Sequence, residues 1–323
     1  MESEIITTEL WIVFFAILTV TISIDLGIIH IIRRKIRQDS RPHSEHVMSF
    51  KESLSWTIVW ISLAGIFAGI IHVLLGYDKT LEFVTGYALE KSLSVDNMFV
   101  FLLVFTTLGI PHKYQHRVLS VGILSAILMR IGIIVVGASL LENFHWMIYV
   151  FGGMLWFTSI RMILQKEEKR IDLEKNIAVR ILRDFISVKL ELVGERFTVM
   201  INGIRYATPL LVALSIIELT DLVFAMDSIP AVLAITKDPF IVITSNVFAI
   251  LGLRALYFLI GGMMERLRYL KIGLIALLLF IGTKMMISDI YHIPTIISLI
   301  IVFAILAVVI VASLVKTKNQ AKK

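Results

Sequence analysis

Long apolar segments limit what this chain can fold into more than any other feature of its sequence. Residues 291–315 contain no Asp, Glu, Lys or Arg. An α-helix rises about 1.5 Å per residue, so a helix over this range crosses a hydrocarbon core of about 30 Å. The chain as a whole is 58% hydrophobic, compared with about 45–50% apolar residues in soluble domains. The sequence therefore predicts a membrane protein that crosses the bilayer several times.

Hydropathy predicts nine segments that cross the membrane. They are expected to be helices, because an α-helix satisfies all of its backbone polar groups within the segment. The alternating pattern of a transmembrane barrel is absent from the sequence. The predicted spans are residues 9–32, 54–76, 83–109, 118–141, 145–164, 207–235, 240–262, 270–290 and 293–315. The expected fold class is an all-α polytopic membrane protein with about nine spans.

Lys and Arg residues gather in alternate loops, which predicts the orientation of the spans. They occupy the first, third, fifth and seventh loops and the C-terminal tail, and the net charge of +6 is dispersed among them. In the intervening loops, Lys79 and Lys237 each stand beside an aspartate. The N-terminus is therefore expected outside and the C-terminus in the cytoplasm, and nucleic acid is not expected as a partner.

An acidic signature occurs twice inside otherwise apolar segments. The copies are Glu90-Lys-Ser-Leu-Ser-Val-Asp96-Asn97 and Asp221-Leu-Val-Phe-Ala-Met-Asp227-Ser228. In each copy a carboxylate is followed six residues later by an aspartate and then by a small side chain that carries an oxygen. Ionisable groups inside a membrane are costly, and by default they mark a substrate or ion pathway.

The chain around these signatures is also duplicated. Arg130 and Arg254 each lie mid-span after a signature, and Phe157-Thr-Ser-Ile-Arg161 is echoed by Phe280-Ile-Gly-Thr-Lys284. Each unit has three spans, so the second copy is expected to be inverted, an arrangement common in secondary transporters with midplane substrate sites. The predicted divisions are 1–82 (two N-terminal spans), 83–164 (first repeat), 165–206 (cytoplasmic amphipathic linker), 207–290 (second, inverted repeat) and 291–323 (last span and basic tail).

The six-residue spacing constrains how the two acids of a signature act. Residues six apart on an α-helix point about 120° away from each other. One regular helix therefore cannot direct both acids at one small ion. Either the helices unwind locally, which Gly86 and Pro230 could permit, or the two acids have different roles.

Five carboxylates are predicted to meet near the centre of the membrane, where the repeats join. They are Glu90, Asp96, Glu218, Asp221 and Asp227, with Asp25, Asn97, Ser228, Arg130 and Arg254 as possible supporting groups. Buried anions this close need protons or a metal ion, and an all-oxygen set suits Mn²⁺, Mg²⁺ or Ca²⁺. The simpler alternative is that the acids only pair with the two arginines. We expect both: the arginines balance some acids, and the others face a cavity.

Other features exclude several classes of function. The chain has no cysteine, so it forms no disulfide, thiolate metal site or cysteine nucleophile. No phosphate-binding loop or nucleophile–base pair is present, so neither an enzyme nor a prosthetic group is expected. In the linker, Ile177, Ile181, Phe185, Val188 and Leu192 follow helical spacing, which predicts an amphipathic helix on the cytoplasmic surface that connects the repeats.

These motifs resemble the TerC family of integral membrane proteins and, in length and order of features, its Alx-like members. The matching stretches are Glu90 to Phe101, Glu218 to Val232 and Asp238 to Phe258, and the likeness extends from the first span to Pro294. The resemblance implies a bacterial inner-membrane protein linked to manganese efflux and metal homeostasis. It also implies that the five acids named above correspond to the acidic residues of the family.

The leading hypothesis is a secondary exporter of a divalent metal, Mn²⁺ above all, coupled to protons or driven by the membrane potential. A second hypothesis is a non-transporting membrane factor that supplies metal to exported proteins or assists their folding. A third is a carrier for an organic cation. Transport of tellurite is disfavoured, because an acidic site repels an oxyanion. The expected partners are the lipid bilayer, a divalent cation and protons.

Overall fold

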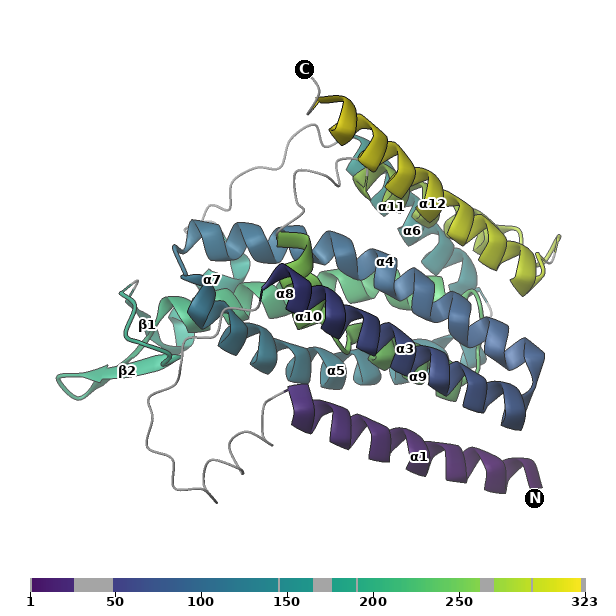
Figure 1. Cartoon of the computed structure of the whole chain (residues 1–323), viewed down its shortest axis with the longest axis horizontal. Helices are drawn as coiled ribbons and strands as arrows, with labels where there is room; N and C mark the ends of the chain where they lie inside the picture. Colours follow the sequence, from purple (N-terminus) through teal and green to yellow (C-terminus); the bar gives the residue numbers. More distant parts are fainter. Residues whose placement is uncertain are drawn as a thin grey trace.

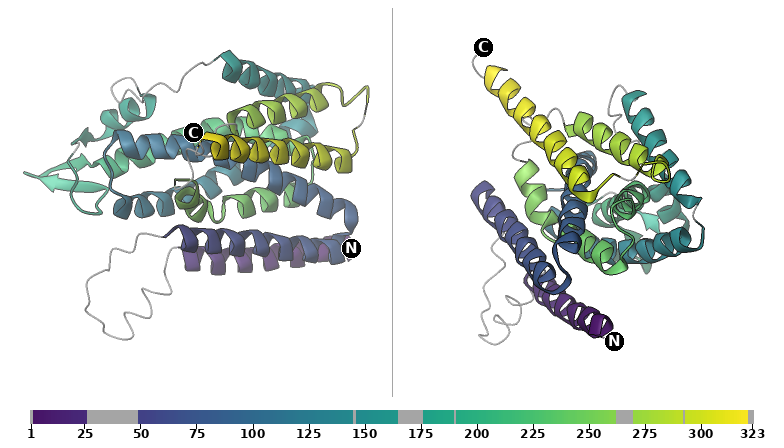
Figure 2. Two further views of the ribbon diagram at one scale, coloured as in Figure 1. Left: turned by 45° about the horizontal axis from the view of Figure 1, so that its top comes forward. Right: turned by 90° about the vertical axis from the view of Figure 1, so that its right-hand side faces the viewer.

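The chain folds mainly into long α-helices that lie alongside one another (Figure 1). The computed structural model describes residues 2–25, 49–144, 146–164, 176–189, 191–261, 270–291 and 293–320. Its helices are α1 (Glu2–Asp25), α3 (Phe50–Leu75), α4 (Tyr77–Thr107), α5 (His112–Asn143), α6 (Met147–Leu164), α7 (Ile177–Phe185), α8 (Pro209–Leu233), α9 (Pro239–Ile250), α10 (Leu253–Gly261), α11 (Leu270–Met286) and α12 (Thr295–Gln320). Helices α1 and α12 lie on opposite outer sides of this bundle (Figures 1 and 2).

Several of these helices are long and apolar enough to cross a bilayer. Among the described residues, α3, α5, α6, α8 and α12 each contain such a segment, and the bent pair of α9 and α10 brings the number to six. Thr8–Ile24 in α1 and Ile272–Met286 in α11 are shorter apolar segments. Each predicted span coincides with a helix or with the bent pair, although residues 26–32 of the first span lie outside the described ranges. The protein is therefore a mostly helical membrane protein, and the full count of nine spans stays a prediction.

Helices that occupy the same place in the two predicted repeats run antiparallel. In the α4–α8 pair, Asn97 contacts Asp221, and Gly86 lies against Val232. The residue number thus rises along one helix as it falls along the other. The first helices of the two units therefore pack against each other in opposite directions.

The α6–α11 pair repeats this antiparallel arrangement. The Tyr149 hydroxyl donates a hydrogen bond to Asp289 over 2.6 Å, and Gly152 lies against Gly282. These are the last helices of the two predicted units, and they pack against each other along an extensive face.

Two further pairs of helices run parallel. Along α5 and α8, Gly122 lies beside Glu218, and Gly137 lies beside Leu233. Along α4 and α9, the Gly86 position faces Ser245, and the Lys91 ammonium reaches the backbone of Ala249 and Leu251. Each signature helix therefore packs in parallel against the arginine-bearing span of the other unit, which is α5 for α8 and the α9 part of the bent pair for α4.

The core of the bundle is centred on α9. Every residue from Phe240 to Ile250 is buried, as expected for a helix that is hydrophobic on all sides. The rings of Phe14, Phe67, Phe83 and Phe248 lie within 6.1 Å of at least one other member of the group, measured between centroids. These aromatic contacts join α1, α3, α4 and α9 and add to the free energy of apolar packing.

The arginine-bearing span of the second unit is broken, whereas that of the first unit is continuous. Helices α9 and α10 meet at an angle of 43° around Leu251 and Gly252. Gly252 has φ +80°, a conformation that favours glycine. A β-carbon built there lies 2.4 Å from Cδ1 of Trp60 on α3, so no larger residue fits without movement. Lys91 of α4 donates to the carbonyl oxygens of Ala249 and Leu251 at 3.0 and 3.3 Å, which satisfies backbone groups that the break leaves unpaired.

The linker between the two units differs from its sequence-based prediction. The predicted amphipathic helix exists as α7, but it ends at Phe185. It is followed by three short strands, β1 (Ser187–Val188), β2 (Thr198–Ile201) and β3 (Ile204–Ala207), in the order β1-β3-β2. Figure 1 shows this sheet at one end of the bundle. Residues 165–175 lie outside the described ranges, and the expectation of an entirely helical chain is corrected by this small sheet.

Close backbone packing between α6 and α11 leads to a prediction for Gly282. A β-carbon there would lie 3.0 Å from the Gly152 carbonyl oxygen and 2.7 Å from Trp156 Cδ1. Gly282→Leu is therefore expected to separate the two helices, because small residues permit such approaches in membranes. The expected result is a clear fall in the midpoint of thermal unfolding in detergent. Gly153→Leu is the control, since no atom lies within 4 Å of that position, and an equal fall in both variants would contradict the prediction.

Candidate functional site

Arg130 of α5 is the centre of a buried ion-pair cluster between α4, α5 and α8. Its Nε and Nη2 atoms donate to the two carboxylate oxygens of Asp221, at 3.2 and 2.8 Å. Its Nη1 atom donates to Glu90 Oε1 and, at 3.4 Å, to Ser228 Oγ. Asn97 Nδ2 donates to Asp221 Oδ1, also at 3.4 Å. The first acids of both signatures therefore meet on one arginine.

This cluster carries more negative than positive charge when its carboxylates are ionised. Glu90 and Asp221 contribute two negative charges and Arg130 one positive charge. The side chains of Glu90 and Arg130 are 0% and 1% exposed, respectively. An uncompensated charge at this depth is costly, so the arrangement favours the binding of a proton or a cation.

Buried oxygen atoms without a hydrogen-bond partner lie on α4 and on the neighbouring helix α9. Oε2 of Glu90 is buried without a hydrogen-bond partner, and so is Oγ of Ser94, one helical turn later on α4. Oδ1 of Asn246 on α9 is buried in the same way. Buried polar atoms are normally hydrogen-bonded, so each of these oxygens is a candidate ligand for a cation.

The other two acids of α8 lie in separate surroundings. The Ser125 hydroxyl of α5 donates to Glu218 Oε1 at 2.6 Å. The Thr158 hydroxyl of α6 donates to Asp227 Oδ1 at 2.9 Å. Both carboxylates are only partly buried. Nine residues separate them along α8, a rise of about 13.5 Å, so the acids are spread along the helix and do not gather at one point.

The remaining predicted residues are placed as follows. Asp96 lies within α4 and Asp25 at the end of α1, but the side chains of both lie outside the described part of the structure. Arg254, at the start of α10, contacts His116 Nε2 at 2.5 Å and Ser120 Oγ at 3.5 Å on α5. Arg130 thus balances acids as predicted, whereas the contacts described for Arg254 are with a histidine and a serine.

The two signature helices are continuous through their acidic residues. Helix α4 extends from Tyr77 to Thr107, and α8 from Pro209 to Leu233 with Pro230 inside its last turn. Unwinding at Gly86 or Pro230 is therefore not what the structure shows. The second alternative, in which the two acids of a signature have different roles, agrees with the separate partners of Asp221 and Asp227.

Across the described part of the chain, no three His, Cys, Asp or Glu side chains lie close enough together to hold a metal ion. The side chain of Asp96 is outside that part. The convergence of five carboxylates on one ion therefore stays a prediction, and the described acids form three settings centred on Arg130, Ser125 and Thr158.

Sequence reasoning missed several residues that the site uses. Lys91, which donates to the backbone at the break between α9 and α10, was detectable because a cation inside an apolar span is costly. Ser125 and Thr158 gave no signal, since hydroxyl side chains are ordinary in membrane helices. At one end of α4, Lys79 contacts Glu82 and Asp238 at 3.0 Å each, so the aspartate that partners it in space comes from the loop between α8 and α9.

The chain matches a known family of membrane proteins. The model described as "Integral membrane protein TerC family" matches residues 75–321, which include the Arg130 cluster and the break between α9 and α10. No solved structure matches the chain.

Several relatives are similar to the chain over nearly its whole length. The Myxococcus xanthus membrane protein STKORF319 is 44% identical, over 96% of this chain and 93% of its own. The Salmonella typhi protein named "Putative membrane-bound redox modulator Alx" is 43% identical, over 98% of this chain and 97% of its own. The protein of the same name in Escherichia coli strain K12 is 42% identical, over 93% of this chain and 92% of its own. With most of its length matched by the family model and by these relatives, the chain belongs to the TerC family of integral membrane proteins.

Proposed function

We propose that this protein is a secondary transporter that exports a divalent metal cation, Mn²⁺ foremost, across the bacterial inner membrane. The cation passes through the region around Glu90, Arg130 and Asp221. The oxygen atoms offered there suit hard cations such as Mn²⁺, Mg²⁺ and Ca²⁺. The metal is the cargo of the protein, and protons are the proposed coupling ion.

One observation carries this proposal. Within a cluster that has an excess of negative charge, one carboxylate oxygen of Glu90 is fully buried without a hydrogen-bond partner. A membrane protein that needed only structural pairing would be expected to satisfy such an atom. A proton and a metal cation are both able to satisfy it, and exchange between the two is the chemistry of an antiporter.

The helix directions support an inverted repeat. Corresponding helices run antiparallel in the α4–α8 and α6–α11 pairs. The α5–α8 pair is parallel, as is its counterpart, the α4–α9 pair. These are the helix directions that a two-fold rotation about an axis in the membrane plane would produce, and transporters built this way bind substrate between the units.

The name shared by several relatives refers to redox modulation. This chain contains no cysteine, so an effect on redox balance would not involve its own thiols. Control of a redox-active metal such as manganese is one route to such an effect, and it is consistent with the transport proposal.

Transport assays with two neutralised acids test the proposal. Glu90→Gln and Asp227→Asn are expected to insert into the membrane but to lower Mn²⁺ flux about tenfold or more, which corresponds to about 1.4 kcal/mol or more in activation free energy. Flux is measured in proteoliposomes over a panel of Mn²⁺, Mg²⁺ and Ca²⁺, with and without a pH gradient. Glu191→Gln, a change at a carboxylate that is 66% exposed, is the control and should retain full flux.

Each result of this experiment has a clear meaning. Normal Mn²⁺ flux in both site variants would rule out the proposed pathway. Binding of Mn²⁺ by the purified wild-type protein without flux would support the alternative, a membrane factor that supplies metal to exported proteins. Flux of organic cations without Mn²⁺ flux would indicate a different substrate class for the same carboxylates.

A further inference from the structure

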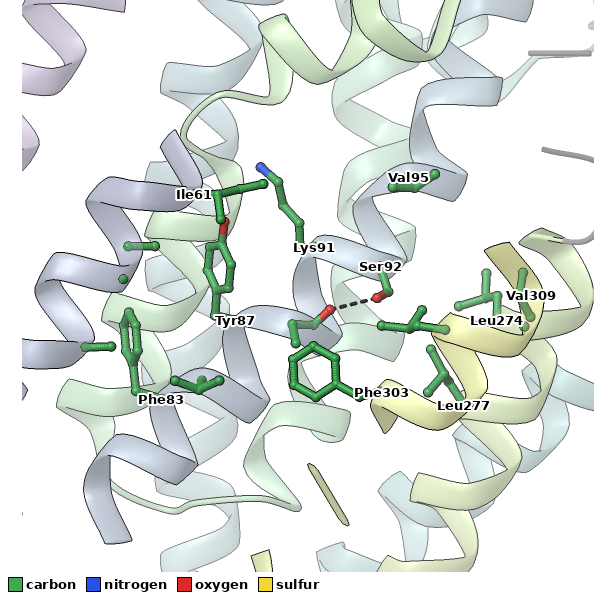
Figure 3. Close-up of a pocket in the computed structure, with 17 residues that line it drawn as sticks. Ile61, Phe83, Tyr87, Lys91, Ser92, Val95, Leu274, Leu277, Phe303 and Val309 are labelled. Carbon is green, nitrogen blue, oxygen red and sulfur yellow. Dashed lines mark hydrogen bonds between the residues drawn. The ribbon is translucent and has the colours of Figure 1, made fainter. Parts of the chain in front are cut away.

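An apolar cavity lies between α3, α4, α11 and α12, away from the Arg130 cluster. Its volume is about 420 Å³, within the range of pockets that bind small ligands. Helices α3 and α12 each pack on α4 and make no extensive contact with each other. Figure 3 shows the rings of Phe83, Tyr87 and Phe303 around this space.

The polar groups of the lining residues are turned away from the cavity or occupied by the protein. The Lys91 ammonium donates to Ala249 and Leu251, and the Ser92 hydroxyl donates to the carbonyl oxygen of Ala88 at 2.7 Å (Figure 3). The hydroxyl of Tyr87 has no hydrogen-bond partner, but protein atoms cover it, so it is not exposed to the cavity. The cavity therefore presents an apolar surface to its contents.

The surroundings of the cavity determine what fills it. Helices α3 and α12, which flank it, both contain segments long and apolar enough to cross a bilayer. Ile61 of α3 and Phe303 of α12 line the cavity and are 48% and 47% exposed. Within the hydrocarbon core of a bilayer, the molecules that meet such surfaces are the chains of lipids.

We propose that this cavity binds one acyl chain of a phospholipid, which enters between α3 and α12. The almost entirely apolar lining favours a hydrocarbon chain over a lipid head group or a quinone ring, whose oxygens would need donors there. The bound chain packs on the methylene groups of Lys91 and thereby holds its ammonium against the break between α9 and α10. This inference does not depend on the proposed transport function.

A cavity-filling substitution tests the proposal. Gly65 of α3 lines the cavity, and no atom lies within 4 Å of a β-carbon placed on it. Gly65→Phe therefore occupies the space without a clash at the β-carbon, and Gly65→Leu occupies less of it. Gly69→Phe is the matched control, because Gly69 is on the same helix, has equally open surroundings and does not line the cavity.

Two measurements on the full-length purified protein read out the result. Native mass spectrometry counts retained lipids, and tryptophan fluorescence follows thermal unfolding as dioleoyl phosphatidylglycerol is added. Wild type and Gly69→Phe are expected to retain one tightly bound phospholipid and to gain thermal stability with added lipid. Gly65→Phe should retain one phospholipid fewer and lose most of the gain in thermal stability, with Gly65→Leu intermediate. If Gly65→Phe does not fold, the comparison of Gly65→Leu with the control decides.

Other ligands are distinguished by parallel additions. Deacylated glycerophosphoglycerol should give no stabilisation, since it lacks the chain. Equal lipid retention and equal stabilisation in the Gly65 variants and Gly69→Phe would overturn the proposal. So would a gain with menaquinone that exceeds the gain with phospholipid and disappears in Gly65→Phe, because it would assign the cavity to a quinone.

Discussion

Arg130→Ala is expected to destabilise the protein by about 3–5 kcal/mol, the usual cost of removing one partner from a buried ion pair. The substitution leaves Glu90 and Asp221 buried without their shared counter-ion. A large fall in the thermal midpoint is expected in detergent, together with poor recovery of the monodisperse protein. Arg180→Ala, a change at an exposed arginine of α7, should alter the midpoint little.

A combined variant separates charge from volume in this cluster. Arg130→Met together with Glu90→Gln and Asp221→Asn replaces the charges with neutral groups of similar size. Most of the lost stability is expected to return, because well-packed neutral replacements of buried ion pairs are often tolerated. Metal flux should stay absent in the stable combined variant. If Arg130→Ala unfolds at the same temperature as Arg180→Ala, the cluster does not support the fold.

Gly252→Val is the second substitution for which a large effect is expected. A non-glycine residue at φ +80° costs about 1–3 kcal/mol in backbone strain, and overpacking adds about 1–3 kcal/mol. The clash is with Trp60, whose Cγ lies 2.5 Å from the position of the new β-carbon. The measurement is again the thermal midpoint, with Gly132→Val in the open surroundings of α5 as the control.

Removal of the tryptophan divides the effect of Gly252→Val into two parts. The double variant Trp60→Ala with Gly252→Val should be destabilised by less than the sum of the two single effects, because the steric clash is absent when Trp60 is removed. The backbone part should persist in the double variant. Strict additivity would show that Trp60 does not enforce the break.

The sequence was sufficient to predict the helices and one important contact. Apolar length located the long helices, because a bilayer admits few other structures, and the spacing of apolar residues located α7. The pairing of Arg130 with acids followed from the same reasoning, since a charge inside a membrane needs a partner. Residue spacing does not specify how the helices pack. It therefore could not predict that Arg130 pairs with the first acids of both signatures, or that Asp227 pairs with Thr158 of α6.

Two features of the fold do not follow from apolar length and charge spacing. The break lies at Leu251 and Gly252 and not at Pro230, which the last turn of α8 accommodates. The break depends on a tryptophan and a lysine from other helices, so local sequence does not reveal it. The sheet was missed although Asn202 and Gly203, both at positive φ, form the dipeptide typical of a tight hairpin. The helical spacing of apolar residues between Ile177 and Leu192 predicts a helix, which the structure has only as far as Phe185, and that spacing carries no information about the hairpin that follows.

The break between α9 and α10 has an energetic consequence for the proposed transport cycle. Two identical inverted halves would give inward-open and outward-open forms of equal energy. In this protein the arginine-bearing span of the second half is broken, whereas that of the first half is the continuous helix α5. The two forms would therefore differ in energy. In the proposed cycle, the empty protein would therefore prefer to open to one side of the membrane, and a substrate would reverse that preference only through tighter binding to the rarer form. If the protein transports a cation as proposed, the break between α9 and α10 would help to determine which side of the membrane the empty binding site faces.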